Sequence, residues 1–188
     1  MLPNFLSEAM FDVVEKTAYR ILDFETPKHR SMVLDHKHDQ EFTNYFINLY
    51  PLFCEKLEIK EVPRKTVRVL FQYVCYKDCE DKNFVGTGIH NDSFAKQFSC
   101  LIPISETGSG TLLYDENLRF VKEVDWKKNC AFVFANKPNH FHEIGSSLKT
   151  TRCLLNVLYM PVGYTEIHEK TFNVKRAVHQ VKHGQKLF

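Results

Sequence analysis

From residue 66 onward, the chain is a series of short runs that are rich in β-branched and aromatic residues. Turn signals such as "TGSG", "DEN" and "GSS" separate the runs. Many short strands at close intervals, each bounded by turn residues, are typical of a β-sandwich or a β-barrel. The pattern predicts a mainly β protein with strands at residues 66–76, 84–92, 97–105, 110–115, 119–126, 130–136, 140–144 and 151–162.

Two helical patterns precede these strands. Apolar residues recur at helical spacing in residues 4–24 and again in residues 39–59. Pro51 lies inside the second pattern, where it should kink or split the helix because proline lacks the backbone N–H. Together the elements predict a double-stranded β-helix, a cupin-like jelly roll, with the helices packed outside. We expect one domain, in which 1–65 is the helical support, 66–163 the β-helix core and 164–188 a tail.

The composition narrows the classes of function. The chain has 188 residues, of which 44% are hydrophobic and 26% charged, as expected for a single soluble domain. A net charge of +2 without a basic stripe does not favour nucleic acid as a partner. The sequence shows neither a signal peptide nor an apolar run of about 18 residues. We therefore expect no membrane contact and a cytoplasmic location.

The cysteines are expected to be reduced core residues. They form no CxxC pair, and most lie inside apolar runs, where cysteine behaves as a small hydrophobic residue. Without a secretory signal, a reducing compartment is the natural expectation. The six residues are Cys54, Cys75, Cys79, Cys100, Cys130 and Cys153.

A candidate metal site begins in "GTGIHNDSF" at residues 86–94. His90 and Asp92 are two positions apart, so in a strand they point to the same face. A later strand must supply the third ligand, and "HFHEI" offers His142, with His140 as a competitor. Two imidazoles and one carboxylate that leave coordination positions open suit non-haem Fe(II). The sequence predicts an iron site with His142 as the preferred third ligand.

Arg152 supports this choice. It opens the next apolar run after His142, where one hairpin turn would set it near the metal. An arginine buried inside a barrel needs an anionic partner, and its planar guanidinium matches a carboxylate. The site would therefore combine a metal with an anion-binding group.

Several motifs in this region resemble one enzyme family. "HND" (90–92), "HEI" (142–144) and Arg152 resemble the HxD…H…R/K signature of the 2-oxoglutarate- and Fe(II)-dependent dioxygenases, in their prolyl-hydroxylase-like branch. "SGTLLY" is similar to the glycine-rich strand of that branch, and "NCAFVFANKPNHFHEI" to the segment that carries its distal histidine. The resemblance extends over roughly residues 66–162. It is more specific than any one motif, because HxD alone is common by chance.

The resemblance implies an oxidoreductase that binds Fe(II), 2-oxoglutarate and O2, with ascorbate as an optional reductant. It would hydroxylate a small-molecule or peptidyl substrate, release succinate and CO2, and be a monomer or a homodimer. Asp92 stands where related halogenases have a small residue, so hydroxylation is the expected outcome. The competing function is that of a cupin-like metal- or sugar-binding protein or isomerase without 2-oxoglutarate chemistry.

The resemblance also implies roles for single residues. His90, Asp92 and His142 would be the catalytic iron ligands, and Arg152 would pair with the distal carboxylate of 2-oxoglutarate. The further expected contacts are a hydroxyl from Tyr73 or Tyr76 to the cosubstrate or the substrate, Asn156 to the cosubstrate or a water, and His140 to the substrate.

Two positions depart from the pattern of the family. Leu154 stands where many relatives have Ser or Thr, so the distal carboxylate needs a hydroxyl from elsewhere. Ile102 and Pro103 stand where a tyrosine is common. Trp126, the only tryptophan, is expected to be a packing residue.

Overall fold

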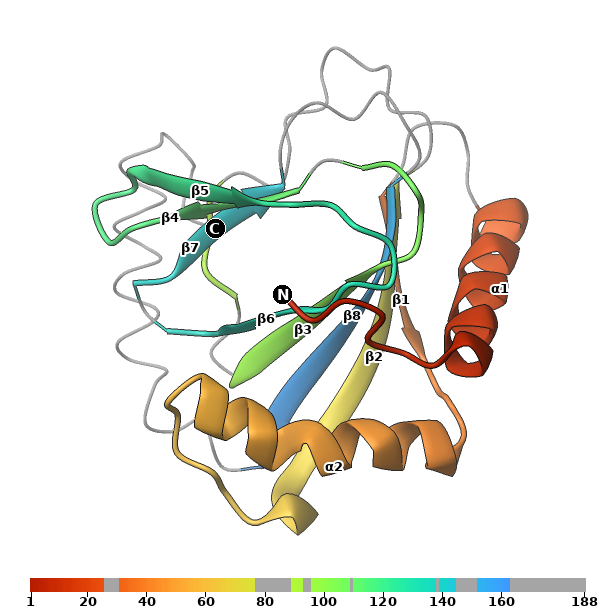
Figure 1. Cartoon of the computed structure of the whole chain (residues 1–188), viewed down its shortest axis with the longest axis horizontal. Coiled ribbons are helices and arrows are strands. Elements are labelled where there is room, and N and C mark those ends of the chain that lie inside the picture. Colours follow the sequence, from red (N-terminus) through yellow and green to blue (C-terminus); the bar gives the residue numbers. More distant parts are fainter. Residues whose placement is uncertain are drawn as a thin grey trace.

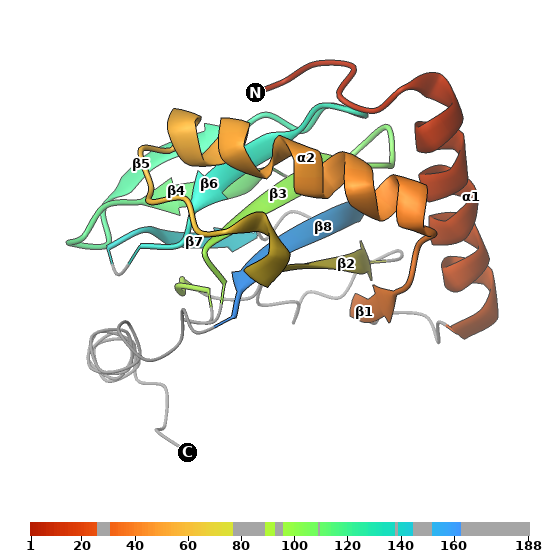
Figure 2. The ribbon, with the colours of Figure 1, turned by 90° about the horizontal axis from the view of Figure 1, so that it is seen from below.

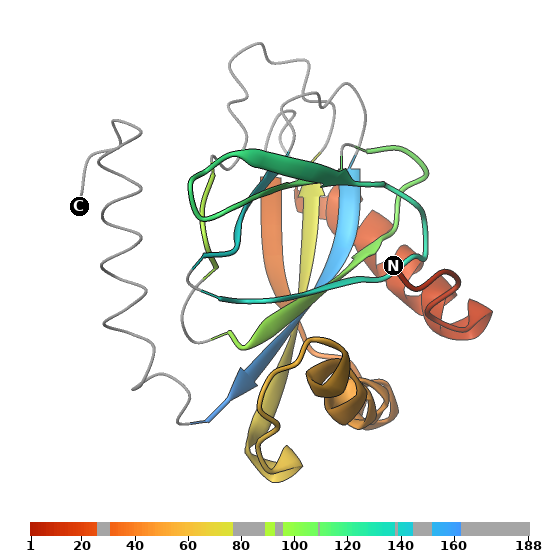
Figure 3. The same ribbon diagram turned by 60° about the vertical axis from the view of Figure 1, so that its left-hand side comes forward.

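Two antiparallel sheets face each other across the interior of the molecule (Figure 1). This computed structural model describes residues 1–25, 31–76, 89–92, 96–108, 110–137, 139–144 and 152–162. The larger sheet has the strand order β1-β2-β8-β3-β6, and the smaller one has the order β5-β4-β7. The strands are β1 (Ser31–His36), β2 (Val67–Tyr76), β3 (Phe98–Pro103), β4 (Thr111–Tyr114), β5 (Phe120–Val124), β6 (Phe132–Ala135), β7 (Phe141–Ile144) and β8 (Arg152–Pro161). The predicted double-stranded β-helix is confirmed, and Figure 3 shows its two sheets from another side.

Alternation along the strands separates the two faces of the larger sheet. In β2, Tyr73 and Cys75 are buried in the hydrophobic core, whereas Gln72 and Val74 line a cavity between the sheets. The same alternation holds in β8, whose core residues are Cys153, Leu155, Val157 and Tyr159 and whose cavity residues are Arg152, Leu154 and Asn156. The face to which a residue belongs is therefore decided by its place in the two-residue period of the strand.

Two helices cover the outer face of the larger sheet (Figure 2). They are α1 (Glu8–Glu25) and α2 (Gln40–Lys56). α2 begins after the N-cap Asp39, whose carboxylate accepts the backbone N–H of Phe42 at 2.8 Å. On its buried face, the ring of Tyr50 stacks on that of Phe98 of β3, with centroids 5.8 Å apart. The helices thus occupy one face of this sheet and leave the other for the cavity.

The sequence predicts a kink or a split at Pro51. The split is wrong, because α2 runs as one helix through this residue, and the kink stays a prediction. A proline inside a helix costs about 3 kcal/mol. Tyr50 and Phe53 on either side are 0% and 3% exposed, and each buried aromatic side chain contributes about 2 to 3 kcal/mol. The packing of this face therefore outweighs the missing hydrogen bond.

β1 is an element that the sequence analysis missed. It pairs antiparallel with β2 over its whole length, from Ser31 opposite Tyr76 to His36 opposite Phe71. The segment before residue 66 is thus not purely helical, because it adds an edge strand to the larger sheet. The division of the domain after residues 65 and 163 stays a prediction. The tail and residues 84–88 of one predicted strand lie outside the described residues.

The prediction of core thiols is confirmed for the five cysteines that the structure describes. Cys54, Cys75, Cys100, Cys130 and Cys153 are free and buried, and Cys79 lies outside the described residues. Among the described residues, no helix has the length and apolar character that crossing a membrane requires.

Candidate metal centre

His90 and His142 face each other across a short antiparallel bridge. β7 is an edge strand of the smaller sheet, and the segment around His90 pairs with its open side. Each histidine donates its backbone N–H to the carbonyl oxygen of the other, both at 2.9 Å. Directly opposed residues carry their side chains on the same face of a sheet. The two ring centroids are 4.5 Å apart, so the bridge sets two nitrogen ligands side by side.

Asp92 joins this pair from the same segment as His90. Lys96 donates from Nζ to Oδ1 of Asp92 at 2.8 Å, and the hydroxyl of Ser99 on β3 donates to Oδ2 at 3.2 Å. A carboxylate offers about four lone-pair positions. The two hydrogen bonds therefore orient the carboxylate and still leave capacity for a metal ion.

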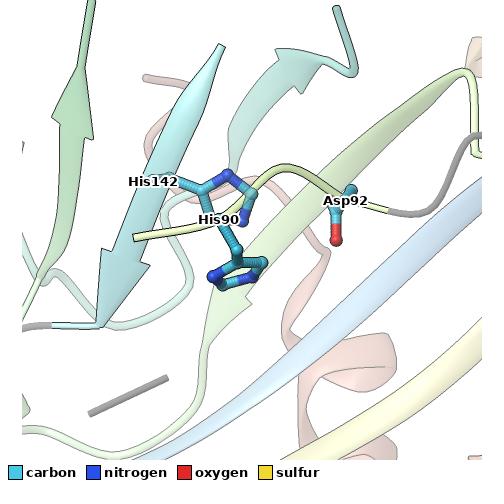
Figure 4. Close-up of side chains that lie close together, drawn as sticks. All are labelled: His90, Asp92 and His142. Atoms are coloured by element: carbon cyan, nitrogen blue, oxygen red, sulfur yellow. The ribbon is translucent and has the colours of Figure 1, made fainter. Parts of the chain in front are cut away.

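The three side chains can hold one metal ion (Figure 4). Their ligand atoms all lie within 4.8 Å of one another. Two imidazoles and a carboxylate form the donor set of facial Fe(II) sites, which keep further coordination positions open. His140, by contrast, is exposed in the turn before β7, with its Nδ1 3.0 Å from the carbonyl oxygen of Ala135. The structure thus brings His142, and not His140, to His90 and Asp92.

The cluster lines a cavity of about 210 Å³ between the two sheets. Arg152, the first residue of β8, lines the same cavity and is only 1% exposed. The remaining lining residues are Gln72, Val74, Leu101, Phe134, Leu154 and Asn156 from the larger sheet, and Thr111 and Ile144 from the smaller one. One cavity therefore combines side chains that could hold a metal ion with a buried guanidinium.

Thr111 is a polar residue of this cavity that the sequence analysis missed. It is 6% exposed, and with Arg152 it lines both the large cavity and a small one of about 20 Å³. Its hydroxyl is a hydrogen-bonding group that the aliphatic side chain of Leu154 cannot offer. The motif "SGTLLY" contained the residue, but alternation within one strand does not say which face turns toward Arg152.

Tyr73 is not at the site, so the expected contact with a cosubstrate is wrong for this residue. Its side chain is fully buried on the outer face of β2, and its hydroxyl lies 3.0 Å from Nε2 of His38. The physical reason is the strand period, because the neighbouring Gln72 and Val74 are the ones that face the cavity. Tyr76 pairs with Arg152 across the two strands, but its side chain lies outside the described part, so its role stays a prediction.

Asn156 and His140 differ in their positions. Asn156 lines the cavity, and its Oδ1 is buried without a hydrogen-bond partner among the described residues. A buried carbonyl oxygen needs a donor, which a water or a bound molecule can supply. His140 is exposed and is not among the residues that line the cavity. Its contact with a substrate stays a prediction.

Burial and charge set the protonation of the ligands. Burial lowers the pKa of His142 to about 4; Asp92 opposes this shift, and His90 and Lys96 add to it. Burial by itself would raise the pKa of Asp92, but the Lys96 ammonium and the two imidazoles hold it below its ordinary value. At neutral pH His142 is thus neutral and Asp92 is ionised. These are the forms that bind a metal.

The lowered pKa of His142 predicts a pH-dependent stability. An ordinary histidine in the unfolded chain titrates near pH 6.5, whereas the folded protein keeps His142 neutral down to about 4. Between these values the unfolded chain binds more protons, so acid favours unfolding. We expect His142 to lower the free energy of unfolding of the metal-free protein by about 3 kcal/mol from pH 6.5 to pH 4. Urea unfolding in the presence of a chelator measures this change.

The exposed His140 provides the matched control for this measurement. His142→Gln should remove the contribution of the buried ring, and His140→Gln should keep the wild-type dependence on pH. If the free energy of unfolding falls equally with pH in the wild type and in His142→Gln, burial does not shift the pKa of His142.

Comparisons with known proteins identify the fold. No family model and no curated protein sequence matches the chain. A prolyl-4-hydroxylase from Pseudomonas putida matches with a TM-score of 0.58 at 13% identity, covering 86% of this chain and 91% of that one. A prolyl hydroxylase from Trichoplax adhaerens matches with a TM-score of 0.57 at 12% identity, covering 92% of this chain and 84% of that one. That enzyme was solved in complex with a peptide fragment of the hypoxia inducible factor oxygen degradation domain. The epimerase SnoN, solved in complex with Fe3+, alpha ketoglutarate and nogalamycin RO, matches with a TM-score of 0.56 at 13% identity. The match covers 85% of this chain and 77% of that one. The chain has the double-stranded β-helix fold of the 2-oxoglutarate oxygenases.

Proposed function

We propose that the protein is a non-haem Fe(II)- and 2-oxoglutarate-dependent dioxygenase that hydroxylates a small-molecule or peptidyl substrate. One observation carries the proposal: the cavity that contains His90, Asp92 and His142 also contains the buried guanidinium of Arg152. A cupin-like metal- or sugar-binding protein would need the ligands, but a neutral sugar does not need a buried cation in the same cavity. A dicarboxylate cosubstrate needs both.

The residues of the chain would divide the work as follows. When bound, iron would supply the activation of O2 that couples oxidation of the substrate to conversion of 2-oxoglutarate into succinate and CO2. His90, Asp92 and His142 hold the metal and leave coordination positions open. Arg152 binds the distal carboxylate through its planar guanidinium. Apolar lining residues keep water away from the reacting groups, and these are Val74, Leu101, Phe134, Ile144 and Leu154.

Asp92 favours hydroxylation over halogenation, because a carboxylate ligand takes the coordination position that a halide would need. The neighbour SnoN is an epimerase and was solved with nogalamycin RO, and the Trichoplax enzyme with a peptide. These two neighbours support both substrate classes and do not choose between them. Mass spectrometry of the product separates the reactions, since hydroxylation adds one oxygen atom and epimerisation leaves the mass unchanged.

The proposed function has a direct test. Fe(II) and 2-oxoglutarate added together without oxygen should produce a weak visible absorption band, because the cosubstrate chelates the metal. Admitting air should then give succinate, with and without ascorbate, whose role as an optional reductant the comparison tests. Absence of both the band and succinate would rule the proposal out.

Thr111 should strengthen the hold on the cosubstrate. Thr111→Val keeps the shape of the side chain and removes the hydroxyl that we place beside the distal carboxylate. A hydrogen bond to a charged group contributes about 1.5 to 3 kcal/mol, so the Kd for 2-oxoglutarate should rise roughly tenfold or more. Calorimetric titration measures it, and Thr111→Ser is the control that keeps the hydroxyl. Equal affinities for all three proteins would exclude this contact.

The location and the assembly are part of the proposal. The five described cysteines are free and buried, which supports a reducing compartment, and we propose the cytoplasm. A monomer or a homodimer is expected, and sedimentation equilibrium decides between them.

A further inference from the structure

Trp126 contacts Arg152 directly. It follows β5, and the Cζ atom of Arg152 lies 4.6 Å from the centroid of its indole ring. Both residues line the small cavity of about 20 Å³, and Arg152 also lines the large cavity with the metal ligands. A guanidinium over the face of an indole is attracted by the negative charge of the ring. Trp126 thus contacts the arginine from the small cavity and is not among the residues that line the large one.

Two further contacts hold the indole in place. Its Nε1–H donates to the carbonyl oxygen of Ser105 at 2.9 Å. On another side the ring lies against Gly108, where an added Cβ would stand 2.6 Å from Cε2 of Trp126. Because real Cβ atoms do not come so close, a side chain at residue 108 would displace the indole.

Ser105 connects the indole to the strand of Arg152. Its hydroxyl accepts the backbone N–H of Cys153 at 3.0 Å and donates to the carbonyl oxygen of Thr107 at 2.9 Å. Its own backbone N–H donates to the carbonyl oxygen of Cys153 at 3.3 Å. The loop after β3 therefore holds the residue next to Arg152 with one group and Trp126 with another. The position of the ring relative to the guanidinium is built into the fold.

We propose that Trp126 is a positioning residue: it holds the guanidinium of Arg152 toward the large cavity and so sets the affinity for a 2-oxo acid with a distal carboxylate. The inference rests on the proposed function. An arginine side chain has many rotamers, and a partner that restricts them before binding lowers the entropy lost when the carboxylate binds. The indole restricts the guanidinium, and it is not itself an anion that would compete with a carboxylate.

The test compares two ligands that differ in the distal carboxylate. Calorimetry measures the Kd of 2-oxoglutarate and of pyruvate for protein loaded with Mn(II), which accepts nitrogen and oxygen ligands. In Trp126→Leu the Kd for 2-oxoglutarate should rise about tenfold, and the Kd for pyruvate should stay within about twofold. Trp126→Phe keeps a ring face and should stay within about threefold of the wild type for both ligands.

Gly108→Ala is an independent variant that leaves Trp126 in the chain and moves its ring. Like Trp126→Leu, it should weaken the binding of 2-oxoglutarate and leave the binding of pyruvate unchanged. Trp126 is the only tryptophan, so the tryptophan fluorescence of the protein reports on this ring alone. In the wild type, saturating 2-oxoglutarate should change this fluorescence emission, and saturating pyruvate should not. An emission that 2-oxoglutarate leaves unchanged counts against the proposal.

The outcomes separate this inference from the proposed function. A selective loss of 2-oxoglutarate affinity in Trp126→Leu or in Gly108→Ala supports it. Wild-type affinity in both variants, or an equal loss for both ligands, overturns the positioning role and leaves the oxygenase intact. If the Mn(II)-loaded wild type binds no 2-oxoglutarate at all, the proposed function fails, and the inference fails with it.

Discussion

Asp92→Ala and His142→Ala are each expected to abolish Fe(II) binding and, with it, the formation of succinate. Each substitution removes one of three ligand atoms that lie within 4.8 Å of one another. Loss of a mere supporting partner of a metal ligand already costs about 10- to 100-fold in affinity, so loss of the ligand itself should cost at least about a hundredfold. Anaerobic calorimetric titration with Fe(II) measures the affinity.

His140→Ala is the matched control for His142→Ala. Both changes remove an imidazole from the same "HFH" segment, but His140 is exposed and its ring lies against the carbonyl oxygen of Ala135. The control should bind Fe(II) within about twofold of the wild type. Loss of metal in His140→Ala with retention in His142→Ala would mean that β7 presents the other residue to the site.

Arg152→Met should weaken the binding of 2-oxoglutarate by at least about a hundredfold. The substitution removes a charge-assisted, two-point contact with the distal carboxylate, which corresponds to about 3 kcal/mol or more.

Two measurements and a second variant make the prediction specific. Titration with 2-oxoglutarate gives the loss of affinity, and thermal unfolding without ligand gives the stability. Arg152→Lys keeps the charge and loses the planar fork, so its affinity should fall between those of the wild type and Arg152→Met. If Arg152→Met unfolds readily and binds 2-oxoglutarate normally, the guanidinium serves the structure and not the cosubstrate.

Much of the fold could be predicted from the sequence, because turn residues and apolar runs act locally. The strands from 66–76 and from 97 onward lie within a few residues of the predicted ranges. β1 was missed because "SMVLDH" lacks clear alternation, and its strand character comes from pairing with β2. A split at Pro51 does not occur, because the buried aromatic residues around it hold the helix together.

Part of the candidate site could also be predicted from the sequence. The pair His90 and Asp92 could be recognised because a separation of two residues places both side chains on one face of a strand. Thr111 and Trp126 could not be connected with Arg152 in this way. They belong to β4 and to the segment after β5, and only the packing of the two sheets brings them to the start of β8.

The sequence by itself determined the types of ligand, their spacing and the alternation of each strand. The tertiary structure decided which face of each strand meets the cavity. It turned Tyr73 toward the helices and its neighbours Gln72 and Val74 toward the metal ligands, and it set His142 opposite His90. The physical reason is that the two-residue period is local, whereas its phase depends on which face packs against α1 and α2 and on the register with distant strands.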